Sequence, residues 1–263
     1  MTLAMDAKKR LSQSEFREKI SGFLEKNSDE GQLSIYVQCR RHQTYKSMKT
    51  LFPENLANRI RAAKIVAVVI IDEPIDAVPL ARALLEGGID TIELTLRTPT
   101  ALESLAAIRR DCPEVFAGLG TVLTPEQVGQ AVQGGAAFAV SPGLNPDVVR
   151  AAAAAGLPFA PGIATPSDIE SAVALGCRLL KFFPAEPSGG ISYLKSIAAP
   201  YAHLGLEYIP LGGLDVENFT RYLALDNVPA VGGSWIAPRD LIRKHDWETI
   251  TANARQATEK VTR

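Results

Sequence analysis

Long apolar runs, paired cysteines and an excess of one charge are all missing from this 263-residue sequence. No apolar stretch approaches the ~20 residues that a membrane-spanning helix requires, and the charged N-terminus lacks the apolar core of a secretory signal. The formal net charge is −1, and no basic stripe with interleaved aromatic residues suggests a nucleic-acid partner. The three cysteines are scattered, which is typical of reduced thiols in a cytosolic protein. We therefore expect a cytoplasmic protein with neither a nucleic-acid nor a membrane partner.

Histidine and metal-binding patterns are scarce as well. The three histidines are His42, His203 and His245, and none of them follows an expected strand, so a histidine base is disfavoured. Cys39 and His42 form a single C-x-x-H without a second pair of ligands, whereas a structural zinc site needs four. We expect no metal site and no cofactor.

What the sequence does contain is a repeat that begins at Lys64. Each unit has a short apolar run followed by an Ala/Leu-rich helical stretch, and in the first five units a proline stands between the two. The expected strands are 64–71, 91–97, 115–123, 138–144, 159–163, 178–183, 206–211 and 228–233. Runs that are apolar on both faces indicate parallel strands covered by helices. Eight such units, with no G-x-G-x-x-G after the first run, favour a closed (β/α)₈ TIM barrel over an open dinucleotide-binding sheet.

Several helix starts are marked by a cap residue directly before a proline. Thr98, Thr124, Asn145 and Thr165 each precede a proline, and an N-cap oxygen followed by proline satisfies one orphan amide and removes another. Polar residues three positions after Thr124 and Thr165 predict capping boxes. Further helices are expected over 53–63, 191–199, 216–225 and 246–262.

Residues 1–47 do not follow the repeat. They carry nine Lys/Arg and six Asp/Glu, and their apolar spacing suggests one helix and one strand. This segment is either a small appendage or a partly disordered arm. We therefore divide the chain into an N-terminal extension, 1–47, and a barrel domain, 48–263, with Met48 as a possible start of the functional unit.

The run 91–97 places charged residues among apolar ones. Thr91, Glu93, Thr95 and Arg97 alternate with apolar residues, so they share one face of a strand and point into the barrel. A carboxylate and a guanidinium buried there are costly unless they are paired or functional. Two interpretations remain open: a structural Glu93–Arg97 ion pair, or a catalytic site.

Lys181 is flanked by apolar residues in the expected strand 178–183. Strands of a parallel barrel are covered, so this lysine is expected to be desolvated, which favours the neutral, nucleophilic amine. The two last strands end in Gly212-Gly213 and Gly232-Gly233. Glycine-rich turns at these two positions of a barrel are typical of a phosphate site.

Together these residues resemble the 2-keto-3-deoxy-6-phosphogluconate (KDPG) / 4-hydroxy-2-oxoglutarate aldolase family. The resemblance covers roughly residues 52–263, and five motifs carry it: Ile92–Thr98, Gly118–Leu123, Ser141–Gly143, Lys181–Glu186 and Gly232–Trp235. It implies a metal-free class I aldolase, usually a homotrimer, that cleaves KDPG to pyruvate and glyceraldehyde 3-phosphate.

The resemblance also implies roles for individual residues. Lys181 corresponds to the Schiff-base lysine, and Glu93 to the acid/base that moves protons through a water. The implied substrate-binding residues, which hold the pyruvyl carboxylate, the imine, the pocket wall or the phosphate, are Arg97, Thr121, Pro142, Phe183, Leu211, Gly212, Gly213, Gly233 and Ser234. Leu211 departs from the Pro-Thr-Gly-Gly of the family, so we expect poor discrimination between C4 epimers or a preference for shorter aldehydes.

Two other readings compete with an aldolase. One is a catalytically weakened barrel that binds phosphosugars or serves as an oligomeric scaffold, which would need neither Lys181 nor Glu93 inside the barrel. The other is a barrel isomerase, which the combination of lysine and glutamate without a strand-end histidine disfavours.

Overall fold

The computed structural model describes residues 50–262, which belong to the second of two units of the chain, Lys49–Arg263. The expected helix and strand of the extension 1–47, and the Cys39–His42 pair, lie outside the described residues.

Strands and helices alternate along this unit, and each of the eight expected apolar runs contains a strand. The strands are β1 (Ile65–Val69), β2 (Thr91–Thr95), β3 (Phe116–Gly120), β4 (Ala139–Val140), β5 (Phe159–Ala160), β6 (Gly162–Ile163), β7 (Leu179–Phe182), β8 (Glu207–Pro210) and β9 (Val231–Gly233). They are shorter than the apolar runs, because the ends of each run form the loops into the helices. The run 159–163 is split at Pro161, which has no N–H to donate to a neighbouring strand.

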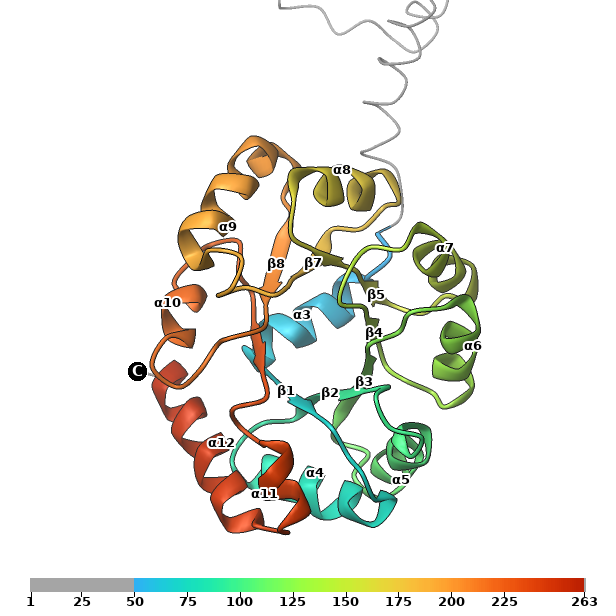
Figure 1. Cartoon of the computed structure of the whole chain (residues 1–263), viewed down its shortest axis with the longest axis vertical. Helices are drawn as coiled ribbons and strands as arrows, with labels where there is room; N and C mark the ends of the chain where they lie inside the picture. Colours follow the sequence, from blue (N-terminus) through green and yellow to red (C-terminus); the bar gives the residue numbers. More distant parts are fainter. Residues whose placement is uncertain (1–49, 263) are drawn as a thin grey trace, which may run out of the picture. The chain divides into compact units, whose positions relative to one another are not determined.

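Except for α3, the helices lie on the outside of these strands (Figure 1). They are α3 (Glu54–Ala63), α4 (Ala77–Glu86), α5 (Ala101–Asp111), α6 (Pro125–Gln133), α7 (Pro146–Ala155), α8 (Pro166–Ala174), α9 (Gly190–Ala198), α10 (Phe219–Leu223), α11 (Arg239–Arg243) and α12 (Trp247–Thr262), with 3₁₀ segments η1 (Pro74–Asp76) and η2 (Ala199–Leu204). The helices expected over 53–63, 191–199, 216–225 and 246–262 are confirmed as α3, α9, α10 and α12, with ends shifted by a few residues. The short α11 was not expected.

All strand pairs are parallel, and the sheet curls around a common interior (Figure 1). One part has the order β5-β4-β3-β2-β1-β9, and the other has β6-β7-β8. Strands of both parts are almost fully buried. The fold is therefore a parallel α/β architecture in which side chains alternate between an outer layer of helices and the interior.

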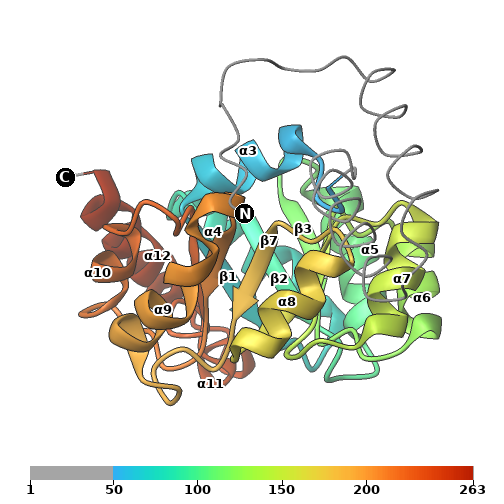
Figure 2. The same ribbon diagram turned by 90° about the horizontal axis from the view of Figure 1, so that it is seen from above.

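One end of the interior is filled by α3, which lies across the strands (Figure 2), and by Phe52 shortly before it. Phe52, Ala57 and Ile60 belong to an apolar cluster with residues of six strands and their ends: Phe116, Phe138, Val140, Ala160, Leu179, Ile209, Leu211 and Ala230. Phe138 makes tilted ring contacts with Phe116 and Phe52, with centroids 5.0 and 6.3 Å apart. Because α3 covers this end, polar chemistry is left to the opposite, carboxyl end of the strands.

The predicted caps are confirmed at three of four positions. Thr124 accepts from the Gln127 amide, Asn145 accepts from the Asp147 amide, and Thr165 forms a full capping box with Asp168. The prediction for Thr98 was wrong, because α5 begins at Ala101. The Thr98 hydroxyl instead donates to the Ile71 carbonyl at 2.7 Å, which ties the end of β2 to the end of β1.

No helix between residues 50 and 262 is long and apolar enough to span a bilayer. Cys112 and Cys177 are buried free thiols, as expected for scattered cysteines. Burial raises the pKa of the Cys177 thiol to about 12, so this cysteine is an unreactive core residue rather than a nucleophile.

Candidate active site

Lys181 and Glu93 meet inside the strands as a buried pair. The Lys181 Nζ lies 2.8 Å from Glu93 Oε1 and 3.1 Å from Oε2, and the two side chains are only 7% and 3% exposed. The two residues are 88 positions apart in the chain. Glu93 therefore pairs with Lys181, and the hypothesis of a structural Glu93–Arg97 ion pair was wrong.

The strands place this pair by simple alternation. Lys181 is the third residue of β7 and Glu93 the third residue of β2, and both side chains point to the interior while their neighbours face the helices. Space for the carboxylate is provided by Gly120 at the end of β3, since a Cβ there would come within 2.1 Å of Glu93 Oε1. A glycine at position 120 is thus a requirement of the site.

Phe183 and Gly212 extend the site from Lys181. The Phe183 ring centroid lies 5.5 Å from Lys181 Nζ, within range of a cation–π contact. The ring also packs on Gly212, where a Cβ would meet it at 3.0 Å. The ring therefore contacts both the amine and the glycine turn that follows β8.

Pro142 and Thr121 are placed next to glycines that adjoin the Lys181–Glu93 pair, Gly162 and Gly120 respectively. A Cβ on Gly162, which pairs with Lys181 in the sheet, would lie 2.1 Å from the Pro142 carbonyl oxygen. Thr121 directly follows Gly120 and has φ +61°, a conformation that is unusual for a β-branched residue and is often found at functional sites. Both residues are half-buried.

Arg97 lies beyond β2 and is exposed. Its backbone amide turns back to the Thr95 carbonyl at 2.8 Å, and its Nε lies 3.3 Å from the Thr95 hydroxyl. The guanidinium consequently lies at the carboxyl end of the strands, where it can meet a ligand, instead of inside with Glu93.

Leu211 is buried in the apolar cluster, beside Gly232, whose Cβ would come within 2.7 Å of the leucine side chain. It also lines a cavity in the interior that reaches from α3 to the Lys181–Glu93 pair. The remaining lining residues are Phe52, Ile60, Val66, Phe138, Val140, Ala160, Leu179 and Ile209. Apart from the pair, every lining residue is apolar, so the amine and carboxylate lie in a dry environment.

Gly212 and Gly213 form a turn after β8, as expected, whereas Gly232 and Gly233 are the last two residues of strand β9 itself. Gly212 and Gly213 both have positive φ, +91° and +82°, which only glycine adopts readily. Gly233 is packed against Trp235, since a Cβ would lie 1.8 Å from its ring, and Ser234 is exposed. The structure places Gly213 and Ser234 on loops and shows no contact of either with Lys181.

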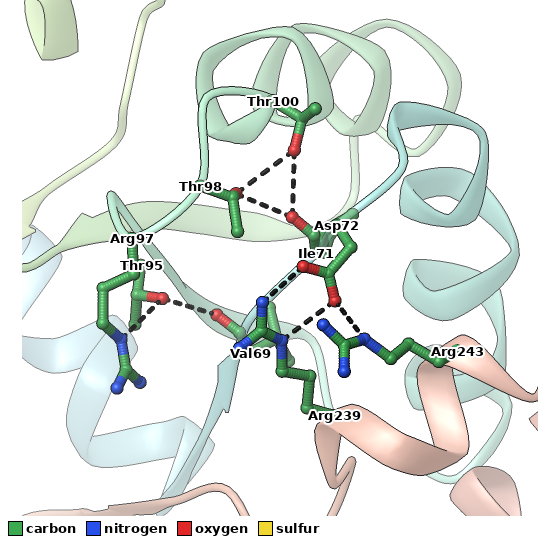
Figure 3. A network of polar contacts seen from close by, with 9 residues as sticks. All are labelled: Val69, Ile71, Asp72, Thr95, Arg97, Thr98, Thr100, Arg239 and Arg243. Atoms are coloured by element: carbon green, nitrogen blue, oxygen red, sulfur yellow. Dashed lines mark hydrogen bonds and ion pairs between the residues drawn. The ribbon is translucent and has the colours of Figure 1, made fainter.

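A charged cluster at the carboxyl end of the strands was not expected from the sequence. Asp72, which follows β1, accepts from Arg239 and Arg243 of α11; the Arg239 Nε lies 2.9 Å and the Arg243 Nε 2.6 Å from Asp72 Oδ2. Figure 3 shows Asp72 facing both guanidinium groups, with Thr98 and Thr100 bonded to the neighbouring Ile71 carbonyl. Hydrogen bonds from Arg239 and Arg243 hold the pKa of the Asp72 carboxyl well below its usual range.

Metal ligation has no support in the part of the chain from 50 to 262, where no group of three His, Cys, Asp or Glu side chains could hold an ion. His203 lies in η2, away from the strand ends. His245 follows α11 and its Nε2 lies 2.9 Å from the buried Asp76 carboxylate. The acid–base group that contacts the Lys181 amine is the Glu93 carboxylate.

Comparison with known proteins identifies the family of this chain. The sequence model of the family described as KDPG and KHG aldolase matches residues 56–253. A protein of Treponema pallidum named 2-dehydro-3-deoxy-phosphogluconate aldolase is 43% identical over 202 residues, which cover 77% of this chain and 95% of the relative.

Two solved structures are similar over most of their length. The KDPG aldolase of Legionella pneumophila, with pyruvate captured at low pH as a covalent carbinolamine intermediate, is 39% identical with a TM-score of 0.72, covering 75% of this chain and 96% of that one. The KDPG aldolase of Zymomonas mobilis ZM4, with 3-phosphoglycerate, is 37% identical with a TM-score of 0.71, covering 76% and 93%. The chain therefore belongs to the KDPG and KHG aldolase family.

Proposed function

We propose that this aldolase cleaves KDPG or a related 2-keto-3-deoxy acid to pyruvate and an aldehyde such as glyceraldehyde 3-phosphate, through a Schiff base on Lys181. The observation that carries the proposal is the 2.8 Å contact between a buried lysine amine and a buried carboxylate in an otherwise apolar interior. The carbinolamine that the Legionella relative forms with pyruvate is the first covalent intermediate of this chemistry.

The first half of the reaction uses the pair directly. Transfer of a proton from Lys181 Nζ to Glu93 gives a neutral amine and a neutral acid, both of which suit a dry site. The amine attacks the keto carbon to form a carbinolamine, and Glu93 returns the proton to the hydroxyl group, which leaves as water. The product is a protonated Schiff base, an electron sink at the former keto carbon.

Carbon–carbon cleavage follows from that electron sink. The Glu93 carboxylate takes the proton of the C4 hydroxyl, the C3–C4 bond breaks, and its electrons move to the iminium nitrogen to give an enamine and the free aldehyde. Protonation of the enamine carbon by Glu93 and hydrolysis of the Schiff base then release pyruvate and restore the pair. Glu93 thus acts as both acid and base, and it is close enough to the amine to do so without a metal.

The surrounding residues are assigned to the two ends of the substrate. Arg97 and Thr121 would bind the pyruvyl carboxylate, since a guanidinium fork can hold a carboxylate bidentately, while Phe183 and Pro142 pack on the imine. Leu211 would face the C4 region. Gly212 and Gly213, with Gly233 and Ser234, would hold a phosphate through backbone amides and the serine hydroxyl.

We also propose that the two parts of the sheet form one closed (β/α)₈ barrel in which β5 and β6 count as a single strand. Only Pro161 separates β5 from β6, and the Tyr208 amide of β8 donates to the Asn227 carbonyl before β9 at 2.8 Å. The Lys181–Glu93 contact, between strands of different parts, is what a closed interior requires.

The assembly and location complete the proposal. We expect a homotrimer in the cytoplasm, with a mass in solution three times the chain mass of 28.3 kDa. Light scattering coupled to gel filtration measures this mass.

The experiment that tests the activity is pyruvate release from KDPG, measured with purified full-length chain in the presence of a chelator. We expect turnover that the chelator does not affect, and the same turnover from a chain that starts at Met48, because every assigned residue follows it. Absence of pyruvate release from KDPG and from 4-hydroxy-2-oxoglutarate would favour a weakened, scaffold-like barrel.

A further inference from the structure

We infer that Glu186, held by Tyr222, is a positioning residue for the phosphorylated end of the substrate. It fixes the Gly212–Gly213 turn in the conformation that presents the backbone amides of the turn. The inference rests on the proposed function, because that proposal places the substrate phosphate at this turn.

Glu186 lies in the loop between β7 and α9, five residues after Lys181. Its Oε1 accepts a hydrogen bond from the hydroxyl of Tyr222 on α10. The same two oxygen atoms pack over Gly190 at the start of α9, 3.3 and 3.4 Å from where a Cβ would be. Tyr222 is fully buried, so the carboxylate is held by a side chain that has little freedom of its own.

The rest of Glu186 packs directly against the turn. A Cβ on Gly213 would lie 2.6 Å from the Glu186 Cβ and 3.1 Å from its Cγ, so the glutamate stem covers one face of Gly213. The Glu186 amide also donates to the Gly212 carbonyl at 3.0 Å. One residue therefore contacts the turn through both its backbone and its side chain.

The carbonyl groups of the turn are all engaged by protein donors. The Leu211 carbonyl accepts from Ala185 at 2.7 Å, and the Gly213 carbonyl accepts from Asn218 Nδ2 at 3.2 Å. Across residues 50–262, by contrast, the amides of Gly212 and Gly213 donate to no protein acceptor. Oriented amides of this kind form an anion-binding concavity.

Such a turn needs external support. Two consecutive glycines have more backbone freedom than any other dipeptide, and that freedom would have to be lost each time a phosphate is bound. Burial, and secondarily the bond to Glu186, raise the pKa of Tyr222 well above its ordinary value, so the phenol remains a donor across the physiological range. The pair thus prepares the turn before the substrate arrives.

The test compares a substrate that carries a phosphate with one that does not. We would compare Glu186→Ala and Tyr222→Phe with the wild type, using KDPG as the phosphorylated substrate and 4-hydroxy-2-oxoglutarate as the unphosphorylated one. We expect KM for KDPG to rise about 10-fold, the scale of one lost hydrogen bond to a charged group, with kcat nearly unchanged. Both constants for 4-hydroxy-2-oxoglutarate should stay within about twofold.

Two further variants define the role. Glu186→Gln keeps the stem and an oxygen acceptor for Tyr222, so it should restore KM for KDPG. Tyr201→Phe is the matched control, since it removes a second tyrosine–glutamate bond, to Glu170 at 2.9 Å, outside the assigned site; its kinetics should match those of the wild type.

Results that would contradict the positioning role differ from those that would contradict the proposed function. Equal losses with both substrates, no loss with KDPG, or a Glu186→Gln variant as impaired as Glu186→Ala would overturn the positioning role. Failure of the wild type to form a pyruvate adduct at Lys181 would instead contradict the proposed function, on which the inference depends.

Discussion

Two groups of ion pairs lie in the site region and differ in how far they are exposed to solvent. One is Lys181 with Glu93, and the other is Asp72 with Arg239 and Arg243. The side chains of Lys181 and Glu93 are 7% and 3% exposed. Those of Asp72 and Arg239 are 23% and 42% exposed, and that of Arg243 is 57% exposed. The first pair crosses the interior, whereas the second group joins the loop after β1 to helix α11 (Figure 3).

The difference in exposure indicates different roles for the two groups of ion pairs. Removing two charges from water costs several kcal/mol per ion, so a buried pair is weak evidence for stability. Exposed pairs are screened and contribute little individually. Asp72, which is partly exposed, connects the loop after β1 to α11 at a smaller desolvation cost than the fully buried pair. We therefore assign a reactive role to the buried Lys181–Glu93 pair and an attaching role to the Asp72 cluster. Burial of a charge alone does not indicate reactivity, because the buried Asp76 carboxylate only pairs with His245.

The substitution with the largest expected effect is Lys181→Met, which removes the amine of the buried pair. Adduct formation and turnover should be abolished, and the free energy of unfolding should fall by about 3–5 kcal/mol, because Glu93 is left buried without a partner. The double variant Lys181→Met/Glu93→Leu should regain the stability but not the activity. Urea unfolding measures both effects, and a single variant as stable as the wild type would show that the pair is better solvated than its burial implies.

Glu93→Gln tests the acid–base role at nearly constant shape. The amide cannot accept and return a proton, so turnover should fall by about 10²–10⁴-fold, while the pyruvate adduct at Lys181 still forms. Steady-state kinetics and mass spectrometry measure the two steps. Turnover close to that of the wild type would make Glu93 a structural partner of the lysine.

Leu211→Thr tests specificity beside the pair. A substrate hydroxyl that faces leucine gives up its hydrogen bond to water and gains none from the protein. This costs about 1–3 kcal/mol, or roughly 10- to 150-fold in a rate ratio. The substitution should therefore change the ratio of kcat/KM for the gluconate- and galactonate-derived epimers. An unchanged ratio would mean that Leu211 only packs in the apolar cluster where it lies.

Asp72→Asn should have the smallest effect, and it should depend on pH. The pKa of Asp72 is lowered by hydrogen bonds from Arg239 and Arg243, so the carboxylate stabilises the fold above its unfolded pKa of about 3.9, and this stability is lost as the pH falls through the lower folded value.

The stability difference between wild type and Asp72→Asn should thus be present at neutral pH and shrink in acid, as measured by urea unfolding. Asp240→Asn, which removes an exposed contact of α11 to Lys244 directly after the helix, is the control. A difference that persists unchanged at low pH would show that the variant acts through packing and not through the charge.

Much of the fold followed from local patterns. The apolar runs contain every strand of the described residues, and Thr124, Asn145 and Thr165 cap helices as expected, because capping depends on residues within one turn. The short helix α11 was missed because five residues show no helical periodicity.

The site was predicted only in part. Burial of Glu93 and Lys181 followed from alternation within β2 and β7. Their contact did not, because spacing in sequence indicates partners on the same element, such as Arg97, and the chain leaves the strand before that residue is reached. Pairs such as Glu186 and Tyr222 join separate elements, so only the fold can bring them together.

The most direct test of a Schiff base on Lys181 is borohydride reduction of the full-length chain in the presence of pyruvate, followed by peptide mass mapping. We expect one covalent adduct, on Lys181, because only this lysine combines burial with a carboxylate at 2.8 Å among the described residues. An unmodified Lys181, or an adduct on another lysine such as Lys195, would contradict it.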